Sequence, residues 1–280
     1  MIVLKEKYLI ALDLDGTMLT DDKRITDESK QIIKHLTDNG HIVVIATGRA
    51  NRLSTFYYQE LGLNTPMINS NGAFIHHPLD KKWESYHLPL QLPTAMEVID
   101  LSLSLDAKNV LAAVQDDVYL ERFDKEIANF YKDTGSDDSI FVGDLKQNLK
   151  QSPTGMLLYP DTDQLDILTN QLDELKTDFV DHRNWGAPFH VIEVMNHSMN
   201  KREGLKRVAE AFHIPKNRII AFGDGPNDLE MIEYAGVGVA MENAIDELKS
   251  LASHFTVTNE ENGVAKFLNE YFNIKNPIVS

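Results

Sequence analysis

The sequence predicts an α/β fold: a doubly wound (Rossmann-like), mostly parallel sheet that forms a core, with an inserted α+β cap domain. Two observations predict it. Short apolar runs alternate with helical segments towards both ends of the 280-residue chain, and strands that are apolar on both faces and joined through helices belong in a covered parallel sheet. The middle of the chain instead combines a hairpin-like pair with helices, which is typical of an inserted α+β domain.

The elements of the core follow from hydrophobic period and from turn residues. In order, they are a strand at 8–12, a helix from Thr26 or Asp27 to Gly40, a strand at 42–46, a helix at 51–61, a short run at 66–69, and later a strand at 190–194, a helix at 201–212, a strand at 218–222, a helix at 229–234 and a strand at 237–240. The alternation predicts parallel pairing on both sides of the insertion.

The insertion is marked by a change in character near the polar stretch 78–83. It contains a hairpin-like pair at 110–114 and 118–121, a run at 156–159, a helix near 163–175 and a run at 179–182. We therefore expect residues 1–82 to form the first part of the core domain, 83–188 the cap domain and 189–280 the second part of the core.

Charge and composition exclude several classes of function. The formal net charge of −16 opposes binding to nucleic acid or to an anionic membrane surface. No apolar run reaches the length of a membrane span, and the charged residues at 5–7 interrupt any secretory apolar region. The absence of cysteine excludes disulfides, thiolate metal ligands and a cysteine nucleophile. We expect a cytoplasmic protein with no membrane or nucleic-acid partner and no obligate protein partner.

The string Asp13-Leu14-Asp15-Gly16-Thr17 follows the first predicted strand. Side chains two apart in an extended segment share a face, so both carboxylates leave the strand together, and Gly16 allows a sharp turn after them. Such an arrangement suits metal-assisted chemistry on phosphate.

Three more polar loops follow predicted core strands. They carry Thr47-Gly48-Arg49, then Asn200-Lys201, then the segment 223–228 with Asp224, Asn227 and Asp228. The carboxyl ends of strands are where α/β sheets present ligands. Together the loops offer a hydroxyl, a cation, further carboxylates and backbone N–H groups for phosphate oxygens.

With these residues the chain resembles the haloacid-dehalogenase superfamily of phosphatases, in particular its Cof-type branch (subclass IIB), whose large cap lies between the second and third motifs. All four superfamily motifs occur in order, and Asn71-Gly72-Ala73 and the stretch 235–244 are similar to signatures of that branch. One departure is Asn200, where relatives often carry Ser. It could adjust the phosphate contacts.

The resemblance implies a mechanism. Asp13 is the nucleophile that forms an aspartyl-phosphate, and Asp15 protonates the leaving alcohol and then deprotonates the hydrolytic water. Because crowded carboxylates cannot all ionise cheaply, we expect one of them to have a raised pKa, with Asp15 as the natural candidate. The phosphoryl oxygens are expected at the backbone amides of Leu14 and Gly48 and at Thr47, Lys201 and Asn227.

The expected cofactor is Mg²⁺, since hard oxygen donors suit it. The expected metal residues are Asp13 and Asp224 through their side chains, Asp15 through its carbonyl, and Asp228, which can bind directly or orient a water or Lys201. The predicted function is Mg²⁺-dependent hydrolysis of a small phosphorylated metabolite, with sugar phosphates as the first guess and nucleotides or vitamin phosphates as the next.

Several alternatives stay open. Asp13–Thr17 could begin a calcium loop, but the glycine and glutamate that such a loop needs would fall at Met18 and Arg24. Arg49 could contact substrate or pair with an acid. The rival functions are a phosphomutase-like phosphotransferase, which passes the phosphoryl group to a sugar hydroxyl, and a non-catalytic phosphometabolite sensor.

Overall fold

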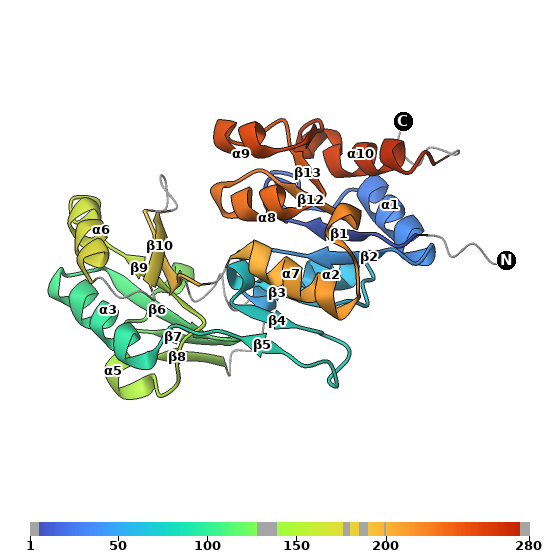
Figure 1. The fold of residues 1–280 in the computed structure, drawn as a ribbon. Coiled ribbons are helices and arrows are strands. Elements are labelled where there is room, and N and C mark those ends of the chain that lie inside the picture. Colours follow the sequence, from blue (N-terminus) through green and yellow to red (C-terminus); the bar gives the residue numbers. More distant parts are fainter. Residues whose placement is uncertain (1–5, 128–138, 176–179, 185–189, 199, 275–280) are drawn as a thin grey trace. The chain divides into compact units, whose positions relative to one another are not determined.

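The computed structural model describes residues 6–127, 139–175, 180–184, 190–198 and 200–274 (Figure 1). These residues form two compact units. The core unit comprises residues 6–49, 54–85 and 200–274, and the cap unit comprises residues 50–53 and the described part of 86–198. In neither unit does a described helix have the length and apolar character needed to cross a membrane.

The core unit contains most of the helices and all of the parallel strand pairs but one. In chain order its elements are β1 (Leu9–Leu12), α1 (Asp27–Asp38), β2 (Ile42–Ile45), α2 (Asn51–Glu60, whose first turn is grouped with the cap unit), β3 (Met67–Asn69), β4 (Phe74–His76), α7 (Lys201–Ala211), β12 (Ile219–Gly223), α8 (Leu229–Tyr234), β13 (Val237–Ala240), α9 (Asp246–Leu251), β14 (His254–Phe255) and α10 (Gly263–Tyr271).

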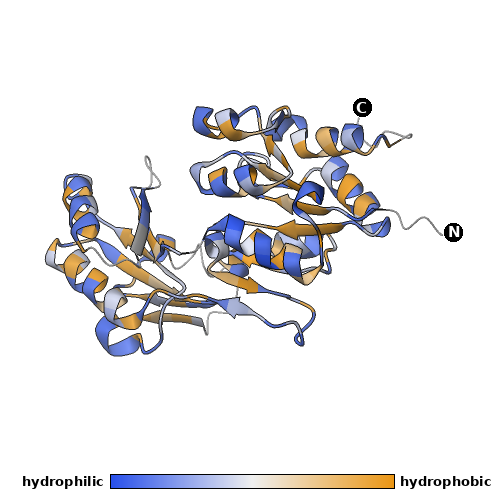
Figure 2. Cartoon of the chain, viewed as in Figure 1, coloured by the Kyte–Doolittle hydropathy of each residue, from blue (hydrophilic) through white to orange (hydrophobic). Residues whose placement is uncertain are grey.

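The core sheet is parallel throughout, in the order β14-β13-β12-β1-β2. All residues of β1, β2, β12 and β13 are buried, as expected for strands covered on both faces. Figure 2 shows these strands as an apolar band between helices that are polar on their outer sides. A parallel bridge between Ala46 and Ile68 adds β3 beside β2. The predicted fold class is confirmed.

The direction of winding reverses between β1 and β12. The connection from β1 through α1 leads to β2 on one side, whereas β12 leads through α8 to β13 on the other. Because such crossovers are right-handed, α1 and α8 cover opposite faces of the sheet. Accordingly, α1 packs against α10, and α8 packs against α7 and α9. The crevice at such a reversal, outside the carboxyl ends of the strands, is where doubly wound sheets bind ligands.

Helix α1 shows how local sequence sets the boundaries. The Thr26 hydroxyl accepts a hydrogen bond of 3.2 Å from the Ser29 N–H, which caps the first turn as predicted. Ile32, Ile33 and Leu36 are buried on one face, and this burial rather than helix propensity stabilises the helix.

The cap unit is built on a six-stranded sheet in the order β10-β11-β9-β6-β7-β8, in which every pair is antiparallel except β7 with β8. One face packs on its helices through an apolar cluster that includes Ile99, Val110, Leu145, Leu158 and Leu168. The elements of the cap unit are β5 (Tyr86–His87), α3 (Leu92–Ser104), β6 (Asn109–Val114), β7 (Asp117–Leu120), β8 (Ile140–Val142), α5 (Leu145–Asn148), β9 (Gly155–Tyr159), α6 (Leu165–Glu174), β10 (Val180–Asn184) and β11 (Ile192–Asn196).

One predicted core strand belongs to the cap instead. The run expected at 190–194 is β11, which pairs antiparallel with β9 and β10. Its assignment to the parallel sheet is therefore wrong, and the second part of the core begins at Asn200. The error has a physical reason: a short apolar run before a helix fits either sheet, and only the partly exposed Glu193 between buried Ile192 and Val194 indicates a strand with one polar face. The expected boundary at 188–189 and Phe179 of the run at 179–182 lie outside the described residues.

Candidate active site

Two neighbouring strands of the core deliver the first two carboxylates. Asp13 follows β1 and Asp224 follows β12, and these strands pair in parallel, with Leu12 opposite Phe222. The Asp13 N–H donates to the Phe222 carbonyl at 3.3 Å. Asp13 is 5% exposed. Both carboxylates therefore leave the sheet side by side at the reversal of winding.

Lys201 joins the site from the first residue of α7. Its Nζ donates to Asp13 Oδ1 at 2.6 Å and to Asp228 Oδ1 at 2.7 Å, and the side chain is fully buried. Burial alone would lower the pKa of Lys201, but Asp13 and Asp228 outweigh it and raise the pKa. Lys201 is therefore held as a cation between two carboxylates.

The start of α7 explains the departure at Asn200. Its side chain accepts a 3.0 Å hydrogen bond from the Glu203 N–H and caps the helix. Ser and Asn are both good N-cap residues, so the exchange preserves the helix start that carries Lys201. The structure assigns Asn200 a capping role.

Asp228 connects Lys201 to the loop after β12. While Oδ1 accepts from Lys201, Oδ2 accepts from the N–H groups of Asp224 and Gly225, both at 3.1 Å. The residue lies in the 3₁₀ turn Pro226–Asp228 and is fully buried. One carboxylate thus fixes both the ammonium group and the backbone of the Asp224 loop.

Asp224 depends on the first motif for its position. Its Oδ1 accepts a 2.8 Å hydrogen bond from the Thr17 hydroxyl. Gly16 has a left-handed φ of +74°, and a Cβ at this position would collide with the Asp224 carboxylate. Gly16 is therefore needed for the close approach of Asp224 as well as for the turn.

Crowding and burial shift the titration of this cluster. Burial raises the pKa of Asp13 well above its ordinary value; Lys201 opposes this shift, whereas Asp228 and Asp224 reinforce it. Burial and the neighbouring Asp228 raise the pKa of Asp224 to about 6, against the hydrogen bond from Thr17. Each proton held by these carboxylates reduces repulsion among them.

Asp13, Asp224 and Asp228 each place a carboxylate oxygen within 4.8 Å of the others. A set of oxygen donors with crowded negative charge matches the preference of hard divalent cations. The raised pKa values of Asp13 and Asp224 are the mark of a site in which additional positive charge would be stabilising. The donor set therefore fits a divalent metal ion.

Asp15 lies in a different environment. Arg49 donates to both of its oxygens, from Nε at 2.6 Å and from Nη2 at 2.7 Å, and the ammonium of Lys23 lies 2.7 Å from Oδ1. Burial would raise the pKa of Asp15, but Arg49 and then Lys23 lower it to about 2. The expectation that Asp15 has the raised pKa is wrong, because it assumed that Asp15 shares the crowded cluster.

Arg49 and Lys23 are held in turn by Tyr57. The Arg49 guanidinium lies 5.3 Å from the centre of the Tyr57 ring, and the Tyr57 hydroxyl donates to the Lys23 carbonyl at 3.1 Å. Of the two roles considered for Arg49, the structure shows the pairing with an acid. Lys23 was not predicted, since a lysine in a polar loop carries no signal of its partner.

The predicted phosphate residues Thr47, Gly48 and Asn227 gather around Asn71. The Asn71 N–H donates to the Thr47 carbonyl at 3.0 Å, and Asn227 Nδ2 donates to Asn71 Oδ1 at 3.0 Å. A Cβ at Gly48 would lie 3.2 Å from Asn71 Oδ1. Leu14 has a fully buried side chain, so it can meet a ligand only through its backbone.

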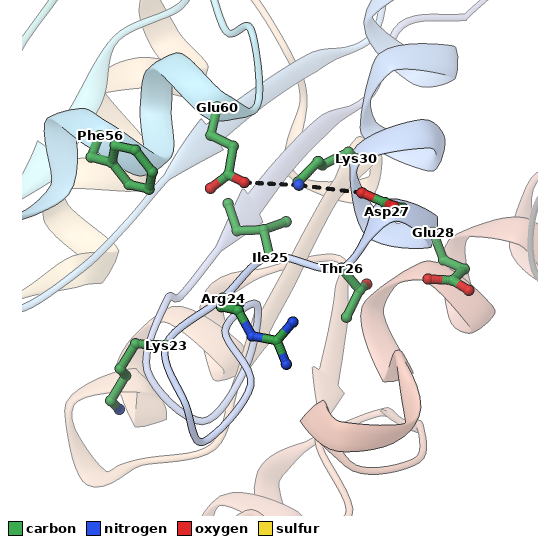
Figure 3. A pocket seen from close by; sticks show the side chains of 9 residues that line it. All are labelled: Lys23, Arg24, Ile25, Thr26, Asp27, Glu28, Lys30, Phe56 and Glu60. Carbon is green, nitrogen blue, oxygen red and sulfur yellow. Dashed lines mark hydrogen bonds and ion pairs between the residues drawn. The ribbon is translucent and has the colours of Figure 1, made fainter.

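The core unit also has a cavity of about 560 Å³ that is not lined by Asp13, Asp224 or Asp228 (Figure 3). Figure 3 shows the Lys30 ammonium between Asp27 and Glu60, with both ion pairs drawn. None of the predicted site residues lines the cavity. Its cations Lys23, Arg24 and Lys30 are all paired with carboxylates, so nothing in it calls for an anionic ligand.

Comparison with known proteins identifies the family of this chain. The family model of haloacid dehalogenase-like hydrolases matches residues 10–268. The Bacillus subtilis (strain 168) protein named 5-amino-6-(5-phospho-D-ribitylamino)uracil phosphatase YitU is 46% identical over 95% of this chain and 98% of its own. A second B. subtilis protein named for the same phosphatase activity, YwtE, is 33% identical over 93% of this chain and 96% of its own.

A solved structure shares the fold. A haloacid dehalogenase-like hydrolase from Bacteroides thetaiotaomicron superposes with a TM-score of 0.84 at 24% identity, covering 95% of this chain and all of the other. The resemblance inferred from the motifs is confirmed, as is the prediction of an enzyme of the phosphatase type. The chain belongs to the haloacid dehalogenase-like hydrolase family.

Proposed function

We propose that this enzyme is a Mg²⁺-dependent phosphatase that hydrolyses a small phosphate monoester through a phosphoaspartate on Asp13. The observation that carries the proposal is the buried cluster in which Lys201 contacts Asp13 and Asp228 at once, with Asp224 within 4.8 Å of both. A structural ion pair needs only one carboxylate beside the lysine, whereas a phosphoryl-transfer site needs a nucleophile, a cation and further carboxylates that can hold a metal ion.

Net charge explains why a metal belongs to the proposal. With Asp13, Asp224 and Asp228 ionised and Lys201 protonated, the cluster carries −3 + 1 = −2, which repels a phosphate dianion. A bound Mg²⁺ would bring the sum to zero and draw electron density from the phosphoryl group. Asp13 and Asp224 would hold it through their side chains and Asp15 through its carbonyl, while Asp228 orients Lys201 and the Asp224 loop.

In the first step, an Asp13 oxygen attacks phosphorus. The new O–P bond forms as the bond from phosphorus to the ester oxygen breaks, and Asp15 gives its proton to that oxygen. In the second step, water attacks phosphorus, Asp15 takes a proton from it, and the bond between Asp13 and phosphorus breaks to release phosphate. The net reaction consumes one water molecule.

The contacts of Asp15 suit the two steps unequally. Ionised by Arg49 and Lys23, it is ready for the second step as a base. For the first step it must carry a proton, so the proposal requires these contacts to weaken when the ester is bound. Thr47, the backbone amides of Leu14 and Gly48, Lys201 and Asn227 would hold the phosphoryl oxygens.

The proposed substrate is 5-amino-6-(5-phospho-D-ribitylamino)uracil, or a phosphate ester close to it. Support comes from two relatives that are named for this substrate and match over nearly their full lengths, at 46% and 33% identity. The phosphate in that compound is a monoester of a sugar alcohol.

The test is a phosphate-release assay on the purified protein. We expect free phosphate from the ribitylaminouracil ester with Mg²⁺, little with a chelator, and slower release from ribose 5-phosphate and glucose 6-phosphate. An isomerised ester without free phosphate would indicate the phosphotransferase, and tight binding without turnover would indicate the sensor. Equal rates on all three esters would contradict the proposed substrate but leave the phosphatase in place.

A further inference from the structure

Asn71 occupies an unusual place in the core unit. Its backbone is left-handed, with φ 52° and ψ 31°, although the residue is only 2% exposed. Left-handed backbone is disfavoured for residues with a Cβ, and Asn is among the few that tolerate it. The N–H of this residue donates to the Thr47 carbonyl at 3.0 Å. The backbone of residue 71 is therefore fastened to the loop that follows β2.

The side chain of Asn71 reaches a second loop. Its Oδ1 accepts the 3.0 Å hydrogen bond from Asn227 Nδ2. The same carboxamide lies against Gly48, where a Cβ would approach Oδ1 to 3.2 Å and Nδ2 to 3.4 Å. Asn71 thus joins two segments: its backbone N–H binds the Thr47–Gly48 segment, and its carboxamide binds the turn Pro226–Asp228.

These two segments carry three of the groups assigned to the phosphoryl oxygens. Stabilisation of a transferring phosphoryl group depends on donors held in place before the reaction. Asn227 and Asp228 share one 3₁₀ turn, so a restraint on Asn227 also bears on the residue that holds Lys201.

We infer that Asn71 is a positioning residue: it holds the Asn227 carboxamide and the Thr47–Gly48 loop at the spacing that seats the phosphoryl group. The inference rests on the proposed function, because it concerns the same phosphoryl site. In this inference Asn71 acts through Asn227 and is not one of the groups assigned to the phosphoryl oxygens.

A double-mutant cycle tests this role. Asn71→Gly deletes the carboxamide but keeps a residue that favours left-handed backbone, and Asn227→Ala removes the group that is positioned. We expect each single variant to lose about tenfold in kcat/KM, the worth of one hydrogen bond, and the double variant to lose no more than Asn227→Ala alone. The Ki of inorganic phosphate as product inhibitor should rise in the same pattern. Independent effects that multiply to about a hundredfold, or an unaffected Asn71→Gly, would overturn the inference.

Two further variants separate positioning from folding. Asn262 is another left-handed Asn, with φ 62°, whose side chain contacts Thr26 instead. Asn262→Gly is the matched control and should keep the wild-type kcat/KM, whatever its unfolding midpoint. Asn71→Asp retains an acceptor for Asn227, so in that background Asn227→Ala should still cost about tenfold. If Asn227→Ala leaves kcat/KM unchanged in the Asn71→Asp background, the inference is contradicted even if Asn71→Gly fails to fold.

The result also distinguishes this inference from the proposed function. A wild-type protein that releases no phosphate from any ester contradicts the proposed function, and with it the role of Asn71. An active wild-type protein with independent effects of Asn71→Gly and Asn227→Ala contradicts the role of Asn71 alone.

Discussion

Asp13 and Asp15 both follow β1, yet their carboxylates lie in opposite electrostatic environments. Asp13 is 5% exposed among two other carboxylates and one buried cation, and its pKa is raised. Asp15, two residues along, has a side chain 42% exposed with two cations on its oxygens, and its pKa is lowered to about 2. The difference teaches that burial and the cations beside each carboxylate, rather than spacing in the motif, decide its protonation.

The largest effect is expected at the nucleophile. Asp13→Asn keeps shape and burial but cannot form an acyl phosphate, so kcat should fall by at least about a thousandfold. The free energy of unfolding should not fall, since a buried carboxylate with a raised pKa is replaced by a neutral group. Phosphate release and urea unfolding measure the two. Asp38→Asn, at an exposed ion pair with Lys34, is the control and should leave kcat intact.

The next effect concerns the buried cation. Lys201→Met leaves Asp13 and Asp228 without their shared partner, and we expect a loss of about 3–5 kcal/mol in the free energy of unfolding, together with loss of activity. Urea denaturation at neutral pH measures it. Lys34→Met, on the exposed helix surface, should change stability by less than about 0.5 kcal/mol. A similar small loss for Lys201→Met would show that the cluster does not depend on its cation.

Stabilisation by a metal ion should distinguish the environment of Asp13 and Asp224 from that of Asp15 without any assay of turnover. Mg²⁺ at a hundred times its Kd should stabilise the wild-type protein by about 2.7 kcal/mol, seen as a higher unfolding midpoint. Asp224→Asn should abolish most of this gain because it removes a proposed ligand, whereas Asp15→Asn should retain it because Asp15 would bind through its carbonyl. Equal loss in both variants would place the Asp15 side chain in the metal site.

The smallest effect is expected at the cations around Asp15. Arg49→Met removes a bidentate partner, so kcat should fall about tenfold as Asp15 loses its orientation. Lys23→Gln removes one contact of a half-exposed lysine, so kcat should fall by less. A larger loss in Lys23→Gln than in Arg49→Met would reverse the ranking of the two cations.

The effect of Arg49→Met on the free energy of unfolding should depend on pH. The pKa of Asp15 in the folded protein, about 2, lies below its ordinary value near 4, so ionisation of this group favours folding. That contribution is complete above pH 4 and is lost as the pH falls towards 2. The difference in unfolding free energy between wild type and Arg49→Met should shrink over this range in urea titrations.

Much of the core was predictable because periodicity and caps are local signals. The helix 201–212 and the strands at 8–12 and 237–240 correspond to α7, β1 and β13 within a residue or two. Three of the four loops of the site could also be predicted, since the carboxyl ends of parallel strands meet at one edge. The loop of Lys201 follows the antiparallel cap strand β11 instead, so this reason does not hold for it. The family resemblance agreed with this local reading and was confirmed by the comparisons.

What failed depends on partners far away in the sequence. Nothing local shows that Arg49 and Lys23 meet at Asp15, so the direction of the pKa shift of Asp15 was predicted wrongly. The strand β11 was assigned to the wrong sheet for the same reason, because pairing is a property of two segments. Asn71 was noticed only as part of a family signature, and its contact with Asn227 is visible only in three dimensions.

The left-handed turn at Gly16 has a consequence for anyone who would redesign this enzyme. The volume that a methyl group would need there is already taken by a carboxylate from a segment encoded near the other end of the gene. A library that randomises codon 16 alone will therefore consist mainly of inactive clones. Varying codon 224 as well would not rescue them, because φ at position 16 stays unfavourable for residues with a Cβ and because Asp224 is itself a proposed metal ligand.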